Sequence, residues 1–128
     1  MRKAFINCRL FDGEREHSGR AVIIEDGQVA DVVADDRAAS LADESIDLDG
    51  LRLVPGFIDL QVNGGGGVLF NDAPTVDALR TIIAAHRAFG TTACLPTLIT
   101  GDNVTMEAAI DAVREAIEQG VPGIIGIH

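Results

Sequence analysis

Residues 54–67, VPGFIDLQVNGGGG, decide the fold class, because here a short apolar strand ends in two amides and four glycines. The run GFIDLQV is largely apolar, which is typical of a strand that is covered on both faces in a parallel sheet. Upstream of Pro55 the apolar residues alternate as in strands, and downstream they recur at helical spacing. We therefore expect a β unit followed by an α/β unit.

Two amphipathic segments and two further apolar runs follow this strand. The runs are TACLPTLI and GIIGIH, and the segment before each ends in a glycine, Gly90 or Gly120, which is suited to a helix end. Asp102 is a candidate N-cap for the second helix. The apolar stripes are Val76, Leu79, Ile83 and His86 in the first helix, and Met106, Ile110, Val113 and Ile117 in the second. The order strand, helix, strand, helix, strand predicts parallel pairing with right-handed crossovers.

The expected strands begin near residues 57, 92 and 124. This repeat suits a (β/α)8 barrel, which takes about 250 residues, and also an open doubly wound sheet. Residues 55–128 hold three strands and two helices, which cannot close a barrel. We expect an incomplete TIM-like barrel whose exposed strand edges pair or aggregate. The alternative is a small, complete α/β domain with the last strand at its edge.

Residues 1–54 are expected to form a small antiparallel β unit, part of a β-sandwich. KAFINCRLF alternates, with Ala4, Ile6, Cys8 and Leu10 on one face. Asp26-Gly27 lies between two apolar runs and predicts a hairpin, and Asp49-Gly50 predicts another turn. The polar segment ADDRAASLADESID is interpreted as a surface connection with one helical turn.

Composition excludes several classes of function. The formal net charge is −10 with a single lysine, which argues against nucleic acid and anionic membranes as partners. No apolar run approaches the roughly 18 residues of a membrane helix, and no secretory leader is evident, so we expect a cytoplasmic protein. Cys8 and Cys94 lie in apolar surroundings and are interpreted as core residues.

Gln61 and Asn63 are two apart on a strand, so their side chains share a face. At the carboxyl end of a barrel strand that face looks into the mouth of the active site. Imidazoles at these positions would bind a second transition metal, whereas neutral amides are poor ligands. We interpret the pair as water-holding groups beside a single metal ion. The alternative is that both amides only satisfy backbone groups at the strand end.

The glycine run allows positive φ and close backbone approach at a strand-to-loop junction. Gly64, Gly65, Gly66 and Gly67 fail the G-x-G-x-x-G spacing, and no Gly-Lys-Ser/Thr follows, so a tight irregular turn is expected rather than a phosphate cradle. Contact of this loop with a substrate phosphate is the weaker alternative. His86 is interpreted as a packed core histidine.

Four stretches together resemble the amidohydrolase superfamily: VPGFIDLQVNGGGG, FND at 70–72, LPTLIT at 95–100 and GIH at 126–128. In that superfamily the first barrel strand carries Pro-Gly-Phe-Ile-Asp followed by His-x-His. Gln61 and Asn63 replace the histidines, which makes the chain similar to the N-acetylglucosamine-6-phosphate deacetylase family. The resemblance covers most of residues 50–128 and fits residues 1–49 only loosely.

This resemblance implies hydrolysis of a small amino-sugar phosphate, N-acetylglucosamine 6-phosphate, to glucosamine 6-phosphate and acetate. It also implies a divalent metal ion, commonly zinc, and a homodimer with a β-sandwich beside the barrel. It places a glutamate ligand two positions after His128, and two histidine ligands and the catalytic aspartate on later strands. His128 then lies facing or beside the metal pocket. The segment itself has no catalytic residue or metal ligand and is expected to be inactive.

Two alternative functions stay open from sequence. One is another amidohydrolase-superfamily enzyme, a cyclic amidase or nucleobase deaminase, although these usually keep His-x-His. The other is a self-contained α/β binding domain that holds a ligand at its glycine loop.

Overall fold

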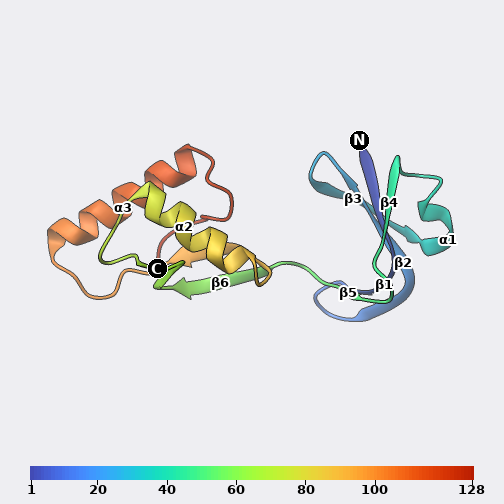
Figure 1. Cartoon of the computed structure of the whole chain (residues 1–128), viewed down its shortest axis with the longest axis horizontal. Coiled ribbons are helices and arrows are strands. Elements are labelled where there is room, and N and C mark those ends of the chain that lie inside the picture. The colour runs from blue at the N-terminus through green and yellow to red at the C-terminus, as the bar shows by residue number, and fades with distance from the viewer. The chain divides into compact units, whose positions relative to one another are not determined.

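The computed structural model describes all 128 residues, which form two compact units, Met1–Pro55 and Gly56–His128. Figure 1 colours the chain from its N-terminus to its C-terminus and labels the main elements. The protein is α/β, with one mixed sheet, one parallel strand pair and one short hairpin. Each unit has its own sheet and its own buried residues, and each is described by itself.

The first unit is a mixed sheet with one helical turn. Its elements are β1 (Arg2–Phe11), β2 (Glu16–Glu25), β3 (Gln28–Ala34), α1 (Asp35–Ala38), β4 (Glu44–Asp47) and β5 (Arg52–Leu53). The strand order is β3-β2-β1-β4, and β5 also pairs with β1. Ala4, Cys8 and Leu10 of β1 are buried, as the alternation predicted. The small residues Ala4, Ala21 and Ala38 let α1 pack closely on the sheet around Ile23.

This unit has two turns with positive φ. One forms the predicted hairpin, and the other connects two strands that run in the same direction. Asp26 and Gly27 have φ of +51° and +80° and join β2 to β3 as the predicted hairpin, since a type I′ turn needs positive φ at both positions. Asp49 and Gly50 also have positive φ, but they separate β4 from β5, which both run parallel to β1. A bulge at Asn7 accommodates this loop, because the Gly50 amide donates to the Asn7 carbonyl at 2.8 Å.

The expectation of a purely antiparallel first unit is therefore wrong. The segment interpreted as a surface connection contains α1 and also β4, which pairs with β1 from Lys3 to Ile6. Helix α1 carries the chain across the sheet, so β4 enters beside β1 in the same direction as β1. A direct turn would have reversed it.

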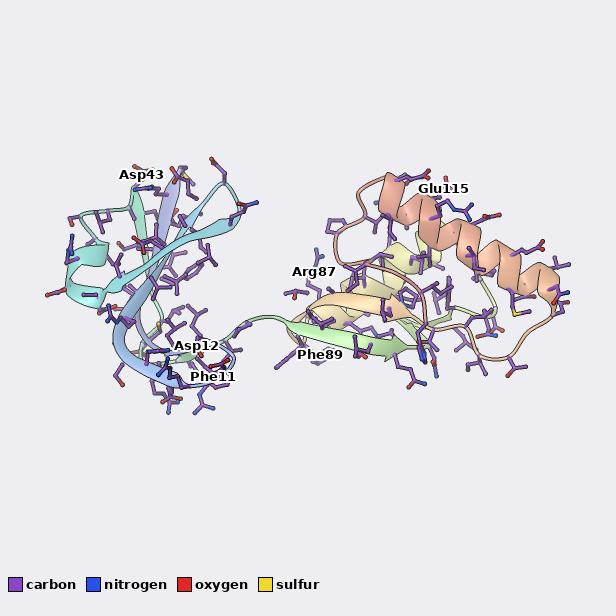
Figure 2. All side chains as sticks on the ribbon, turned by 180° about the vertical axis from the view of Figure 1, so that it is seen from behind. Phe11, Asp12, Asp43, Arg87, Phe89 and Glu115 are labelled. Carbon is purple, nitrogen blue, oxygen red and sulfur yellow. The ribbon has the colours of Figure 1, made fainter.

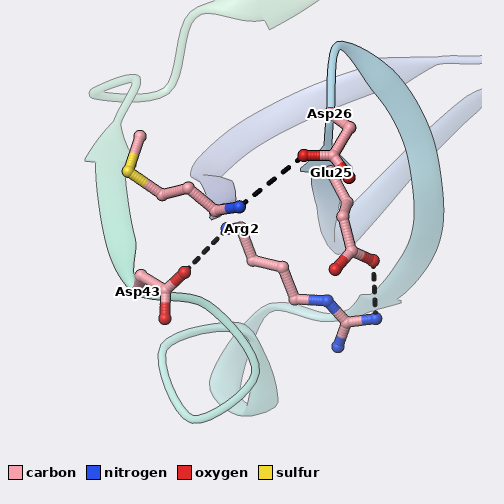
Figure 3. Close-up of polar contacts among 5 residues, drawn as sticks. Arg2, Glu25, Asp26 and Asp43 are labelled. Carbon is pink, nitrogen blue, oxygen red and sulfur yellow. Dashed lines mark hydrogen bonds and ion pairs between the residues drawn. The ribbon is translucent and has the colours of Figure 1, made fainter.

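Ion pairs and hydrogen bonds at the start of β1 connect it to its neighbours (Figure 3). The Arg2 amide donates to Asp43 Oδ2 at 2.8 Å, just before β4. The Arg2 guanidinium lies 3.0 Å from Glu25 Oε2 at the end of β2, and the Met1 amino group is 3.7 Å from Asp26 Oδ1. These groups are exposed, so the contacts fix register more than they add stability.

The second unit is a β-α-β core with a further helix. Its elements are β6 (Phe57–Val62), β7 (Gly64–Gly65), β8 (Val68–Leu69), α2 (Val76–Arg87), β9 (Thr91–Pro96) and α3 (Asn103–Glu118). Strands β6 and β9 are parallel, and α2 is the crossover between them. The core lies between this strand pair and the helices, around Phe70, Leu79, Ile82 and Cys94, none of which is exposed.

The two helices begin where the sequence allows capping. Thr75 accepts a hydrogen bond from the Ala78 amide at 3.2 Å, and Asp102 accepts one from the Thr105 amide at 2.8 Å. Gly90 and Gly120 follow the helix ends with φ of +96° and +66°, as predicted. Neither helix is long and apolar enough to cross a lipid bilayer.

The buried stripe of α2 agrees with the prediction, and that of α3 does not. Leu79 and Ile83 of α2 are buried, with Ile82 added. In α3 the core face consists of Val113 and three alanines, whereas the other predicted stripe residues are exposed. Those exposed residues are Met106, Ile110 and Ile117. Alanine on the inner face permits close approach of the helix, so the larger side chains lie outside.

The third strand that was expected in GIIGIH is reduced to one bridge. Ile124 pairs with Cys94 in parallel, and the Cys94 amide donates to the Gly123 carbonyl at 2.7 Å. The His128 amide also donates to the Pro96 carbonyl at 3.0 Å. The segment runs along β9 without forming a regular strand. Pro96 contributes to this outcome because it has no amide hydrogen to offer the ladder.

Candidate functional site

The carboxyl ends of β6 and β9 lie at the same edge of the second unit, because the two strands are parallel. The Thr97 amide donates to the Val62 carbonyl at 2.8 Å, which joins the loop after β9 to the end of β6. The Leu98 amide donates to the His128 carbonyl at 3.1 Å. Three chain segments that are far apart in sequence therefore meet at this edge. We call it the carboxyl rim, defined by residues 61–63, 97–99 and 128.

Gln61 and Asn63 both lie at the carboxyl rim with exposed side chains. Val62 between them is buried in the core, so the alternation of the strand turns the two amides away from the helices. The backbone near them is already bonded: the Gln61 amide donates to Asp59 Oδ1 at 3.1 Å, and the Asn63 carbonyl accepts from Phe70 at 2.9 Å. The side chains of Gln61 and Asn63 are exposed, on the face opposite the buried Val62.

The four glycines form a regular hairpin, and the expected irregular turn is wrong in this detail. Gly64 and Gly65 make β7, which pairs with β8, and Gly66 and Gly67 turn with φ of +61° and +82°. A Cβ on Gly64 would lie 2.2 Å from the Val68 carbonyl oxygen, and one on Gly65 would lie 2.9 Å from His86 Nε2. Glycine is required here because the hairpin packs directly against itself and against α2.

His86 anchors this hairpin to α2. Its Nε2 lies 2.9 Å from the Gly64 carbonyl oxygen, and the ring is half-buried. The interpretation of His86 as a packed structural histidine is thus confirmed. A ring nitrogen that is engaged with a backbone carbonyl donates its hydrogen there, so this nitrogen has no lone pair for a metal ion.

His128 and Thr97 meet at the carboxyl rim. Thr97 is buried, and its hydroxyl lies 3.2 Å from the Leu95 carbonyl and 3.4 Å from His128 Nδ1. A hydroxyl has one hydrogen, which the Leu95 carbonyl receives, so the Thr97 oxygen accepts from Nδ1–H of His128. This arrangement favours the neutral tautomer in which His128 Nε2 carries the lone pair.

Asn71 is not a rim residue, but it bonds the backbone of the rim residue Ile99, and the sequence pattern did not single it out. Its Nδ2 donates to the Ile99 carbonyl at 2.8 Å, and its Oδ1 accepts from the Ile99 amide at 2.8 Å. This paired contact connects the loop after the glycine hairpin to the loop after β9. The sequence contained a signal, FND at 70–72, but the partner lies 28 residues away and could not be identified from spacing.

Neither cysteine is a nucleophile or a ligand candidate. Cys8 and Cys94 are free and buried, as the sequence predicted. Burial raises the pKa of Cys94 to about 11, and nearby Asp59 adds to the effect. Burial also raises the pKa of Cys8. Both thiols stay protonated at neutral pH, and the thiol form is unreactive.

The donor groups of this chain do not fit a complete metal centre. No group of three or more His, Cys, Asp or Glu side chains comes together anywhere in the 128 residues. At the carboxyl rim His128 is the one good ligand, beside two neutral amides. A catalytic metal site normally takes three protein ligands.

A surface groove of about 460 Å³ lies elsewhere, between the N-terminal half of α2 and α3. Its charged and polar lining residues include Asp77, Arg80, Glu115 and Gln119. Arg80 is already bonded to Gln119 Oε1 at 2.8 Å. Figure 2 labels Glu115 on α3. None of the predicted site residues lines this groove.

No family model matches the chain. Comparison with curated proteins finds relatives that are named as amino-sugar phosphate deacetylases. An N-acetylgalactosamine-6-phosphate deacetylase of Shewanella sp. (strain ANA-3) is 66% identical over 76 residues, covering 59% of this chain and 19% of the relative. An N-acetylglucosamine-6-phosphate deacetylase of Haemophilus influenzae is 34% identical over 128 residues, covering all of this chain and 33% of the relative.

The solved structures agree with the sequence relatives. The crystal structure of N-acetylglucosamine-6-phosphate deacetylase from Pasteurella multocida superposes with a TM-score of 0.88 at 32% identity, covering 93% of this chain and 31% of that one. The chain thus spans about a third of the length of the proteins that it matches over nearly all of its own residues.

Proposed function

We propose that this chain, which is homologous over its whole length to N-acetylglucosamine-6-phosphate deacetylases, is part of an enzyme that hydrolyses the N-acetyl group of an amino-sugar phosphate. The products are acetate and the free amino-sugar phosphate. The observation that carries the proposal is the agreement of sequence and fold with these deacetylases along nearly the whole chain. Cyclic amidases, deaminases and small binding domains are not favoured, because the matching relatives are named as deacetylases.

In this proposal residues 1–54 form part of a β-sandwich, and residues 55–128 form the first three strand positions and two helices of a (β/α)8 barrel. The parallel β6-α2-β9 unit supports it, as does the segment after α3 that returns to lie beside β9. In such barrels the active site lies at the carboxyl ends of the strands. The carboxyl rim is therefore the part of this chain that we assign to the active site.

The chain contributes groups that orient substrate and water. The exposed amides of Gln61 and Asn63 can donate to and accept from a substrate or a water molecule at the rim. His128 presents Nε2, and Thr97 holds its ring. At Gly67 the space beside the α-carbon is open, whereas at Gly66 it is filled by Thr81. A substrate phosphate that contacts the glycine loop would therefore approach at Gly67. Neither a carboxylate nor a set of three metal ligands is among these groups, so the chain alone is expected to be inactive.

Amidohydrolases are in general metal-dependent. In the complete enzyme a divalent ion, which we expect to be a single zinc ion, would supply Lewis-acid chemistry toward an amide carbonyl and a water molecule. Its ligands would come from residues that this chain does not contain. Elemental analysis of the complete enzyme should give one ion per active site. Replacing both Gln61 and Asn63 with histidine should raise that occupancy, because imidazoles bind transition metals well.

The proposal includes a homodimer for the complete enzyme and a cytoplasmic location. The two free, buried cysteines are compatible with a reducing compartment. Size-exclusion chromatography with light scattering of the complete enzyme tests the dimer, and fractionation of cells that express the complete protein tests the location.

A second candidate substrate is N-acetylgalactosamine 6-phosphate. The relative named for that substrate is 66% identical over 76 residues, against 34% for the Haemophilus influenzae relative over the whole chain. The two sugars differ only in the orientation of the hydroxyl group on C4. A hydrogen bond to that hydroxyl would give the enzyme a means to distinguish them.

A chimera tests the proposed function. This chain replaces the homologous third of the Haemophilus influenzae relative, and acetate release is measured with both sugar phosphates. We expect turnover by the chimera, none by the isolated chain, and a ratio of kcat/KM values that identifies the preferred sugar. A folded chimera that releases acetate from neither substrate would contradict the proposal, as would enzyme-like turnover by the isolated chain.

A further inference from the structure

His86 joins helix α2 to the glycine hairpin that β7 and β8 form. Its Nε2 lies 2.9 Å from the Gly64 carbonyl oxygen. A carbonyl oxygen only accepts hydrogen bonds, so this nitrogen carries the hydrogen. A Cβ on Gly65 would lie 2.9 Å from the same nitrogen. The ring of His86 therefore lies directly against the backbone of the hairpin and donates to it.

The Gly64 carbonyl takes its hydrogen bond from His86 because the hairpin does not supply one. The Phe70 amide donates to the Asn63 carbonyl at 2.9 Å, and Gly64 lies opposite Leu69 in the register. Antiparallel pairs alternate between hydrogen-bonded and non-hydrogen-bonded ones, so the pair of Gly64 and Leu69 is of the second kind. The Gly64 carbonyl thus points away from β8, and His86 fixes its position.

Asn63 directly precedes this fixed carbonyl, and its side chain is exposed at the carboxyl rim. The far end of the hairpin is held separately, because Phe70 follows β8 and is fully buried in the core. At the near end the hairpin is held to α2 by His86. The direction of the Asn63 side chain therefore depends on the peptide group of Gly64, which His86 holds.

We propose that His86 is a positioning residue for deacetylation, because it sets the direction of the Asn63 amide at the carboxyl rim. His86 does not touch the reacting atoms, since its Nε2 faces the backbone of the hairpin. An amide that is already held in its productive direction lowers the entropic cost of reaching the transition state. The inference rests on the proposed function, which assigns the carboxyl rim to the active site.

NMR spectroscopy of this chain tests the coupling of His86 to Asn63 without a measurement of activity. The ring nitrogen signals of His86 should show the hydrogen on Nε2. His86→Leu removes the donor and should shift the side-chain amide signals of Asn63. His86→Gln places an amide nitrogen near the position of Nε2 and should keep these signals close to those of the unaltered chain. Val113→Ala, a truncation in the core face of α3, should leave them unchanged.

Kinetics of the chimera with the Haemophilus influenzae relative test the role in the reaction. His86→Leu should lower kcat/KM by about tenfold or more, since a small misplacement of an active-site group has effects of this size. His86→Gln should restore most of the loss. Asn63→Ala should also lower kcat/KM, and adding His86→Leu to it should cause no further loss, because His86 acts through Asn63. Val113→Ala destabilises the same unit and should leave kcat/KM unchanged.

The outcomes separate this inference from the proposed function. If His86→Leu shifts the Asn63 signals but the folded chimera releases no acetate, the positioning of Asn63 is supported and the function is contradicted. If the chimera is active and His86→Leu lowers kcat/KM equally with and without Asn63→Ala, the inference is overturned and the function stands. A hydrogen on Nδ1 of His86, or an unchanged kcat/KM in His86→Leu, also overturns the inference. Circular dichroism confirms that each variant is folded, and the ring signals of the unaltered chain need no variant.

Discussion

At the residue scale, Asn71 shows how one side chain can connect two loops of the candidate site. Both polar atoms of its amide bond the backbone of Ile99, and both distances are 2.8 Å. The same loop holds the end of β6 and the carbonyl of His128. Asn71 is therefore a positioning residue for the carboxyl rim, and its effect is structural rather than chemical.

Asn71→Ala should destabilise the second unit and free the loop after β9. Two hydrogen bonds of about 1 kcal/mol each are lost, so urea denaturation should show a loss of about 1–3 kcal/mol. The Ile99 amide should exchange with solvent deuterium faster. Asn71→Asp keeps the acceptor for the Ile99 amide and loses the donor, and its effect should be intermediate. Unchanged exchange at Ile99 in both variants would contradict this role.

Asp12 gives the first unit a pH dependence. At the β1–β2 turn, labelled in Figure 2, its carboxylate accepts from the amides of Glu14 and Arg15 at 2.9 Å, and His17 Nε2 lies 2.6 Å away. The Arg15 amide, then His17, then the Glu14 amide hold the pKa of Asp12 well below its usual range. Because the folded pKa is below the unfolded value of about 4, this contribution is complete above that value and is lost as the pH falls.

Thermal unfolding measured between about pH 6 and pH 2 tests this dependence. The unaltered chain should lose stability as Asp12 is protonated, below about pH 4. Asp12→Asn keeps an acceptor for the turn but has no charge to lose, so its stability should fall less over the same range. Parallel curves for the two proteins would show that Asp12 does not contribute.

At the element scale, α3 shows that apolar periodicity predicts a helix more reliably than it predicts which face is buried. The sequence contains two stripes, one of large residues and one of alanines, and burial of the larger side chains would remove more apolar area from water. The structure buries Ala109, Ala112 and Ala116 beside Val113. The choice depends on how closely α3 approaches α2, and that distance is not encoded in the helix alone.

Comparison of two truncations in α3 tests this orientation. Val113 is 3% exposed and Ile117 is 46% exposed. Val113→Ala removes two buried methyl groups at about 0.8 kcal/mol for each carbon and leaves a cavity, so it should cost about 2 kcal/mol. Ile117→Ala removes more atoms but from a half-exposed site and should cost less than about 1 kcal/mol. If chemical denaturation shows a larger loss of stability for Ile117→Ala than for Val113→Ala, the buried face of α3 would be the stripe predicted from sequence.

At the scale of the whole molecule, the side chains that could bind a metal ion are spread along the chain. No three candidate side chains converge. The isolated chain should therefore unfold at the same temperature with and without EDTA, because a protein is stabilised only by an ion that it binds. Isothermal titration with zinc should show no tight site. A chelator-sensitive melting temperature would mean that the rim assembles a metal site unaided.

Much of the fold could be predicted from the sequence because it rests on local rules. Asp26-Gly27 needs positive φ at two positions and formed the expected hairpin, and Asp102 capped the expected helix. The β4 and β5 pairing could not be predicted, because parallel neighbours of β1 are separated from it by more than 30 residues. The prediction of a strand at the end of the chain was wrong for a related reason, because the pairing of this segment depends on the backbone of β9.

In the candidate site, too, some features follow from neighbouring residues and others depend on contacts between distant ones. Alternation alone placed Gln61 and Asn63 on the face opposite the buried Val62. Sequence by itself determined strands β1, β6 and β9, the two long helices, the Asp102 cap, the Asp26-Gly27 turn and the kinship to the deacetylases, because these follow from neighbouring residues. Only the tertiary structure decided that Asn71 clamps Ile99, that Thr97 faces His128, and that the alanine face of α3 is buried. Those contacts join residues distant along the chain, and packing geometry, rather than spacing, selects them.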